Sequence, residues 1–232
     1  MEMFIEIPFE KRKQSGYIAL MITRDLKDGF TYVVKQPFIM KSMVLAALLN
    51  LFLTPYFIEG GPIVLRLTMG SGNTMYGIGM GLINVATIIG ALSVGFFAKK
   101  IQVSTLHYWL LIIAVLVLPT ALSVTPIMLN LGYYPSFILF IISTVLIAMI
   151  MTIASIFVIT KVQKKTPNEN LGKVMAIITA ASQCMAPIGQ IIYGLAFESF
   201  SGYVYLPTLF VSIVMLGLTL LTYRMMRNEA IV

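Results

Sequence analysis

The stretch KVQKKTPNENLGKVM, residues 161–175, is a polar island between two long segments without charge. Residues 101–160 before it contain no Lys, Arg, Asp or Glu, and neither do residues 174–197 after it. An apolar run of 18 or more residues with few or no charges predicts a membrane-spanning helix. The island therefore predicts a loop between two membrane spans.

The composition of the whole chain agrees with that interpretation. Apolar residues make up 59 % and charged residues 11 %, whereas soluble domains hold about half and about a quarter. Two further charge-free blocks cover residues 67–98 and 199–223, and a third, 42–58, has 17 residues. These blocks predict an all-α integral membrane protein with several spans.

The longest block, residues 101–160, must hold two spans, because about 20 helical residues already cross a hydrocarbon core of about 30 Å. The connection is predicted at TPIMLNLGYYPS, residues 125–136, with two prolines, a glycine and a tyrosine pair. The chain then has six spans, at about residues 42–64, 76–97, 105–123, 136–160, 173–197 and 204–223.

The basic residues predict the orientation of these spans. Residues 1–41, 98–104, 161–173 and 224–232 fall on one face of the bilayer and hold 15 of the 16 Lys and Arg residues. Short loops rich in Lys and Arg stay cytoplasmic. We therefore expect a multi-pass cell-membrane protein, with a cytoplasmic N-terminal segment (1–41), a bundle (42–223) and a cytoplasmic tail (224–232). The lipid bilayer accounts for the basic character, so no nucleic-acid partner is predicted.

An amphipathic helix is expected before the first span, from about residue 15 to residue 36. Its apolar residues recur at helical spacing, namely Ile18, Ile22, Leu26, Phe30 and Val33. Such a helix fits the cytoplasmic surface, where it would brace the bundle. Binding of a partner is the alternative. A second local signal is Thr166-Pro-Asn-Glu169, whose spacing predicts a capping box that begins the fifth span.

Small residues on one side of the second span predict close approach of another helix. They are Gly77, Gly81, Asn84, Ala91 and Gly95. In the fifth span, Pro187 and Gly189 predict a bend. A proline in a membrane helix is tolerated where neighbours or a water-filled cavity satisfy the backbone.

Polar side chains within the spans are the candidates for lining a substrate cavity. They are Asn50, Asn84, Gln183 and Gln190, with the hydroxyl residues Thr152, Ser155, Thr179 and Ser182 as weaker candidates. Each amide could instead bond between helices and stabilise the bundle. A hydroxyl can return its bond to its own helix.

Ionisable groups near the spans are few. Glu59 and Arg66 flank a Gly-Gly-Pro sequence that is expected to end the first span. They could form a gating ion pair, or Glu59 could titrate in proton coupling. One His and one Cys provide no cluster with metal-ligand spacing. We therefore predict no enzyme, no cofactor and no metal site.

Three segments resemble the major facilitator superfamily of transporters. DLKDGFTYVVKQP (25–37) is similar to the helix before that family's seventh span. YGIGMGLINVATIIGALSVGFFAKK (76–100) is similar to its eighth span and the second copy of its loop motif. TPNENLGKVMAIITAASQCMAPIGQIIYGLAFE (166–198) is similar to its eleventh span. The branch of bacterial drug exporters typified by macrolide efflux pumps is the most similar, over roughly residues 20–223.

The resemblance implies the C-terminal half of a twelve-span secondary transporter. Six spans would then form two inverted three-helix repeats. The cytoplasmic loop motif would fall on Gly95, Ala98, Lys99 and Lys100, with Lys99 where the stronger form of the motif carries an acidic residue. An N-terminal six-span half, in the same polypeptide or as a second copy, would be the partner.

The implied activity is export of amphipathic drugs by alternating access, driven by protons if it is an antiporter. The first, second, fourth and fifth spans would line an apolar, aromatic-rich cavity. A sugar would require more buried polar groups. Two alternatives remain: a stand-alone six-span protein that pairs with itself to transport, and a non-transporting scaffold or regulator from a truncated gene.

Overall fold

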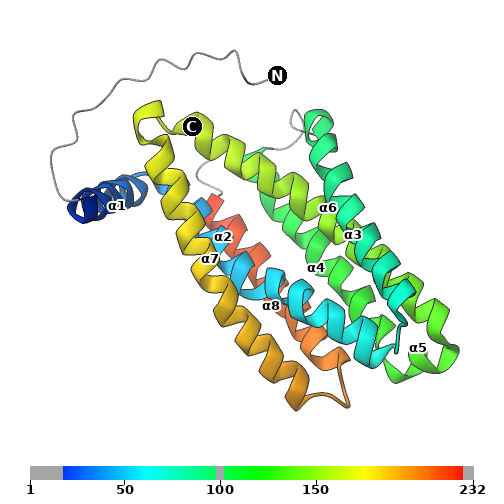
Figure 1. The fold of residues 1–232 in the computed structure, drawn as a ribbon. Coiled ribbons are helices and arrows are strands. Elements are labelled where there is room, and N and C mark those ends of the chain that lie inside the picture. Colours follow the sequence, from blue (N-terminus) through cyan, green and yellow to red (C-terminus); the bar gives the residue numbers. More distant parts are fainter. Residues whose placement is uncertain (1–17, 98–101, 227–232) are drawn as a thin grey trace, which may run out of the picture.

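The protein is described by a computed structural model that places residues 18–97 and 102–226 (Figure 1). Every regular element in these two ranges is a helix. Six helical segments are long and apolar enough to cross a membrane, as predicted. The protein is therefore an all-helical, multi-pass membrane protein.

The first span, Pro37–Thr68, consists of α2 (Pro37–Pro55) and two π-helical segments, η1 (Tyr56–Gly60) and η2 (Ile63–Thr68). The second is α3 (Asn73–Phe97), and the third joins η3 (Val103–Thr105) to α4 (Leu106–Ser123). A short helix, α5 (Pro126–Leu131), fills the predicted connection. The last three spans are α6 (Tyr133–Lys165), α7 (Asn168–Ser199) and α8 (Tyr205–Met226).

The sequence analysis predicted that the first span ends at its Gly-Gly-Pro sequence. This prediction was wrong. The helical backbone continues to Thr68 through the wider π turns. Pro62 lacks only one amide hydrogen, and π turns accommodate such irregularities within a helix. Gly60 is buried against the ring of Phe197, whose Cε2 atom would lie 2.8 Å from a Cβ at this position. The glycine therefore serves packing here.

The loop between α6 and α7 is shorter than predicted, because both helices continue into the polar island. Only Thr166 and Pro167 separate them. The predicted capping box is wrong: Thr166 ends α6, and its hydroxyl donates to the Val162 carbonyl at 2.7 Å. A carbonyl at the end of a helix lacks an intrahelical partner, and the buried hydroxyl satisfies this one.

The most extensive contacts between spans join α2 with α7, α3 with α6 and α4 with α8, and α4 also packs extensively against α6 (Figure 1). Glycine brings the first two pairs together. A Cβ at Gly189 of α7 would collide with the Leu51 carbonyl of α2, and one at Gly90 of α3 would lie 2.9 Å from the Met149 carbonyl of α6. In the third pair, the Ser212 hydroxyl of α8 donates to the Ala114 carbonyl of α4 at 2.9 Å.

Two spans leave most of their surface uncovered. In their most apolar stretches, only 11 % of α3 and 17 % of α7 is buried, against 33–44 % for the other four spans. The small residues expected to contact another helix, Gly77, Gly81, Ala91 and Gly95, all lie on the exposed side of α3. Within the described chain, Gly79 and Gly90 make the contacts instead.

Helix α1 (Ile18–Lys35) lies crosswise to the spans at one end of the bundle (Figure 1). It packs against α7 and α2. The Lys173 ammonium of α7 lies 2.6 Å from Asp25 and 4.0 Å from Asp28 of α1. Gln36 alone separates α1 from α2.

Candidate functional site

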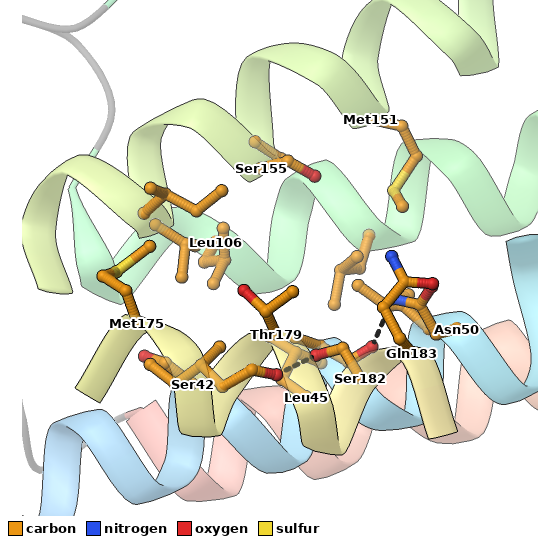
Figure 2. A pocket seen from close by; sticks show the side chains of 17 residues that line it. Ser42, Leu45, Asn50, Leu106, Met151, Ser155, Met175, Thr179, Ser182 and Gln183 are labelled. Carbon is orange, nitrogen blue, oxygen red and sulfur yellow. Dashed lines mark hydrogen bonds between the residues drawn. The ribbon is translucent and has the colours of Figure 1, made fainter. Parts of the chain in front are cut away.

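A cavity of about 230 Å³ opens between α2, α4, α6 and α7. Figure 2 shows its lining, with α7 and α2 along one side and α6 opposite. Asn50 and Gln183 come from the middle third of their spans, which places the cavity at membrane depth if the six helices cross the bilayer. Its position among four helices resembles that of ligand sites in helical bundles.

Polar side chains enter this cavity from three helices. Two come from α2, one from α6 and three from α7, in an otherwise aliphatic lining. They are Ser42, Asn50, Ser155, Thr179, Ser182 and Gln183. Thus the predicted amides Asn50 and Gln183 are brought together here, with three of the weaker hydroxyl candidates, Ser155, Thr179 and Ser182.

The hydrogen-bond partners decide which of these groups can bind a ligand. The Asn50 amide donates to the Ala46 carbonyl at 3.0 Å, and the Ser182 hydroxyl donates to the Ile178 carbonyl at 2.8 Å. The Asn50 carbonyl oxygen accepts no hydrogen bond from the part of the chain that the structure describes. Among the same residues, the side chains of Ser155, Thr179 and Gln183 have no hydrogen-bond partner.

Ser42 is the most buried of the polar residues that line the cavity. Its side chain is 2 % exposed, and its hydroxyl has no hydrogen-bond partner among residues 18–97 and 102–226. Leaving a buried hydroxyl unpaired costs about 1–3 kcal/mol.

The cavity lining includes no Asp, Glu, Lys, Arg or His among the described residues. A charged ligand would therefore lose its hydration without an ionic partner. Aromatic rings are also missing from this lining, so the expectation of an aromatic-rich cavity was wrong. Leucine, isoleucine, valine, alanine and methionine form the walls instead, and the aromatic rings of α2 and α7 pack into the core beyond the cavity.

Three of the predicted polar residues lie elsewhere. Asn84 is on the exposed side of α3. Thr152 packs against Gly90 of α3, and its hydroxyl donates to the Ala148 carbonyl of its own helix at 2.8 Å. Gln190 lies on α7, half-buried and outside the cavity lining.

The predicted gating residues are separate from the cavity. Glu59 lies half-buried in η1, and Arg66 is near the end of η2. The Arg66 guanidinium donates to the Asn73 side-chain carbonyl and lies 4.2 Å from the centre of the Tyr76 ring. In the described part of the chain, no ion pair joins Glu59 to Arg66. Arg66 instead fixes the short connection between the first two spans.

The remaining predicted positions are distributed along α3 and α7. Pro187 is exposed inside α7, which continues as a helix on both sides of it. Gly189 is the buried contact with α2 described above. Gly95 is exposed near the end of α3, and the other three loop-motif residues, Ala98, Lys99 and Lys100, lie outside the described residues.

Sequence reasoning missed Ser42 and the two methionines of the lining, Met151 and Met175. Ser42 stands at the boundary of a charge-free block, where a serine predicts nothing in particular. The methionines carry no positional signal either, although their flexible side chains suit a surface that adapts to different ligands.

A second hollow, between α2, α7 and α8, has a volume of about 370 Å³. Its lining is apolar apart from Tyr193, whose hydroxyl is buried without a partner in the described chain. No other polar side chain faces this space. The cavity between α2, α4, α6 and α7 is therefore the better candidate for specific recognition.

Comparison of the chain with protein-family models, with curated proteins and with solved structures found no match in any of the three. Conclusions about function therefore depend on the chain's own residues and packing.

Proposed function

We propose that the chain is one six-span half of a secondary transporter, which binds an uncharged amphipathic molecule in the cavity between α2, α4, α6 and α7. One observation carries this proposal. Unpaired polar groups from three helices meet at membrane depth in a cavity without any ionisable side chain. Polar groups placed in this way can orient a ligand, while the aliphatic walls accept its apolar part.

The packing of the spans supports an inverted-repeat arrangement. Suppose that α2, α3 and α4 form one repeat and that α6, α7 and α8 form the other. Then α2 corresponds to α6, α3 to α7 and α4 to α8. When each helix is replaced by its counterpart, the pair α2–α7 becomes the pair α6–α3, and the pair α4–α8 stays the same. These are the three most extensive contacts between spans, while the fourth, α4 with α6, would correspond to the smaller contact of α8 with α2. Transporters built from such repeats place their substrate near the bilayer midplane.

The two glycine contacts follow the same exchange. Gly189 of α7 meets the backbone of α2, and Gly90 of α3 meets the backbone of α6. In the proposed repeats, α7 corresponds to α3 and α2 to α6. Each repeat would thus use a glycine in its second helix to approach the first helix of the other repeat.

The exposed sides of α3 and α7 support the need for a second six-span body. In a membrane, small residues allow two helices to approach closely. Gly77, Gly81 and Gly95 have no atom within 4 Å of an added Cβ. A second half, in the same polypeptide or as a second copy, would cover this side, and the two halves would rock around the cavity.

The distribution of basic residues supports a location in a bacterial-type cell membrane, with both termini in the cytoplasm. Fifteen of the 16 Lys and Arg residues fall on one predicted face. Export of drug-like amphiphiles is the activity that the superfamily resemblance favours. A proton-coupling carboxylate would come from Glu59 or from the other half.

The test is direct binding of a radiolabelled, uncharged macrocyclic lactone to the chain in lipid nanodiscs. Gln183→Leu removes a cavity amide while keeping similar volume. We expect it to weaken binding about fivefold, which corresponds to one hydrogen bond of about 1 kcal/mol. A cationic amphiphile of the same size should compete poorly.

Gln190→Leu is the matched control, because it makes the same chemical change on the same helix outside the cavity. It should leave the affinity unchanged. The proposal fails if the wild-type chain shows no saturable binding, which a non-transporting scaffold would give. It also fails if the two substitutions weaken binding equally.

A further inference from the structure

From Thr23 to Lys35, helix α1 uses only a narrow strip of its surface to contact the bundle. Between Thr23 and Lys35, only Gly29 and Val33 are buried. A Cβ at Gly29 would lie 3.1 Å from the Lys173 Cβ and 3.3 Å from the Ile177 Cγ1 of α7. The contact is close, but it covers only a small part of the helix circumference.

An apolar strip of α1 remains uncovered beside this contact. Leu26, Phe30 and Val34 are 46 %, 53 % and 49 % exposed. Their spacing of four residues places them along one side of the helix. Three large apolar side chains held half-exposed in a row require an apolar environment.

The connection to the first span fixes the depth of α1. Its last residue, Lys35, is followed by Gln36 and then by Pro37, the first residue of α2. A one-residue link keeps the helix at the level where α2 enters the hydrocarbon. Helix α1 also lies crosswise to the spans (Figure 1). We therefore expect its exposed strip to run along the membrane surface.

The charged residues of α1 differ in their position relative to the exposed strip. Asp25 and Asp28 are directed to the α7 side, where both lie within 4.0 Å of the Lys173 ammonium. Helical geometry places Lys27 directly beside the exposed apolar strip, whereas Arg24 and Lys35 lie farther round the helix, next to Asp28. All three cations are exposed. The strip is thus bordered by the bundle on one side and by Lys27 on the other.

We propose that α1 is a binding surface for anionic phospholipids. The strip of Leu26, Phe30 and Val34 inserts at the boundary between headgroups and acyl chains, and Lys27 binds a lipid phosphate. An amphipathic helix with a basic polar face binds membranes in this way. The inference needs only a membrane-embedded bundle, so it stands independently of the proposed transport function.

The test uses the full chain with one tryptophan, placed in the exposed strip. The sequence contains one tryptophan, so Trp109→Phe combined with Phe30→Trp gives a single reporter on α1. The protein is reconstituted in phosphatidylcholine nanodiscs with increasing fractions of phosphatidylglycerol that carries brominated acyl chains. We expect blue-shifted emission and strong quenching, with a preference for brominated phosphatidylglycerol over brominated phosphatidylcholine.

Trp109→Phe combined with Thr31→Trp is the matched control, since Thr31 is exposed on the cationic side of α1. Its tryptophan should be quenched less. Red-shifted, unquenched emission at position 30 would overturn the proposal, because the strip would then face water. Blue-shifted emission without quenching would also overturn it, because protein rather than lipid would then cover the strip.

The charge requirement is tested in the Phe30→Trp background by Lys27→Gln. We expect the preference for phosphatidylglycerol to fall about fivefold, the usual effect of one basic residue near an anionic membrane. Lys164→Gln, at an exposed lysine near the end of α6, should have a smaller effect. Equal losses would mean a general electrostatic attraction and would overturn the assignment to α1.

Discussion

At the scale of single residues, the closest helix contacts of this bundle depend on the absence of a side chain. Gly189 lies against the Leu51 carbonyl, and its added Cβ would be 2.5 Å from the Pro55 Cγ. Both belong to α2. In a membrane, helix association depends strongly on such packing, since lipid tails are as apolar as the helices.

We therefore predict that Gly189→Ala separates α2 from α7. Because the obstacle is backbone, the new methyl group has no space, and the free energy of unfolding should fall by about 1–3 kcal/mol. Unfolding in mixed micelles measures the change. Gly194→Ala is the control on the same helix, because no atom lies within 4 Å of its added Cβ. Equal stability of the two variants would contradict the predicted contact.

The polar side chains of the spans divide into two groups, according to whether they have a hydrogen-bond partner within the described residues. Several buried hydroxyls donate to carbonyls of their own helix, such as Ser143 to Leu139 and Thr144 to Phe140. They cannot offer the same hydrogen to a ligand. The hydroxyl of Ser42 and the amide of Gln183 have no such partner within the described residues, and both line the cavity. Recognition is therefore expected from the second group.

At the scale of elements, α1 contacts α7 through the ion pairs of Lys173 with Asp25 and Asp28 and through a tight contact at Gly29. The Lys173 side chain is 26 % exposed and that of Asp25 is 55 % exposed. Such partly exposed pairs contribute between zero and about 1 kcal/mol, because water and salt screen them. The pair therefore sets the position of α1 more than the stability of the fold.

Lys173→Gln should loosen α1 while leaving the spans intact. Amide hydrogen exchange in residues 23–35 should rise up to about fivefold at low salt, and the difference should shrink at high salt. Global unfolding should change by less than about 1 kcal/mol. Lys164→Gln removes a charge outside this pair and should not alter exchange in α1. Unchanged exchange in Lys173→Gln would show that the ion pair does not hold the helix.

At the scale of the whole molecule, α3 and α7 are the two spans with the least buried surface. The small residues on the exposed side of α3 match the pattern of membrane helix interfaces. The transport proposal therefore requires a second six-span body next to these helices.

Native mass spectrometry of complexes extracted from the source membrane tests this requirement. We expect a species about twice the 25.7 kDa of this chain. Gly81→Leu should weaken association about tenfold, because bulky side chains keep helices apart. It should leave the unfolding of the chain itself unchanged, since nothing lies within 4 Å of an added Cβ. A species of 25.7 kDa alone would contradict the paired transporter.

Much of the fold was predictable because few backbone structures can satisfy all of their hydrogen bonds inside a bilayer. Charge-free blocks such as residues 174–197 locate spans directly, since each backbone group must be bonded inside its own helix. The ends of the spans were less predictable. A helix can keep its backbone hydrogen bonds beyond the edge of the bilayer. For this reason α6 extends to Lys165, although the charge-free block ends at residue 160.

The cavity was only partly predictable. Asn50 and Gln183 were indicated because amides are rare inside spans, but the same reasoning pointed to Asn84 and Gln190, which lie outside the cavity. Periodicity describes which residues share a side of one helix. It does not say which helices are neighbours, so it cannot select the amides that meet.

The sequence by itself determined the membrane class, the six spans and the amphipathic helix, because these depend on local hydrophobicity and charge along the chain. The tertiary structure alone decided that α2 pairs with α7 and α3 with α6, and that Gly90 and Gly189 are the close contacts. It also decided that the cavity is aliphatic and uncharged. These properties arise from side chains far apart in sequence, and only the packing of helices against one another brings such groups together.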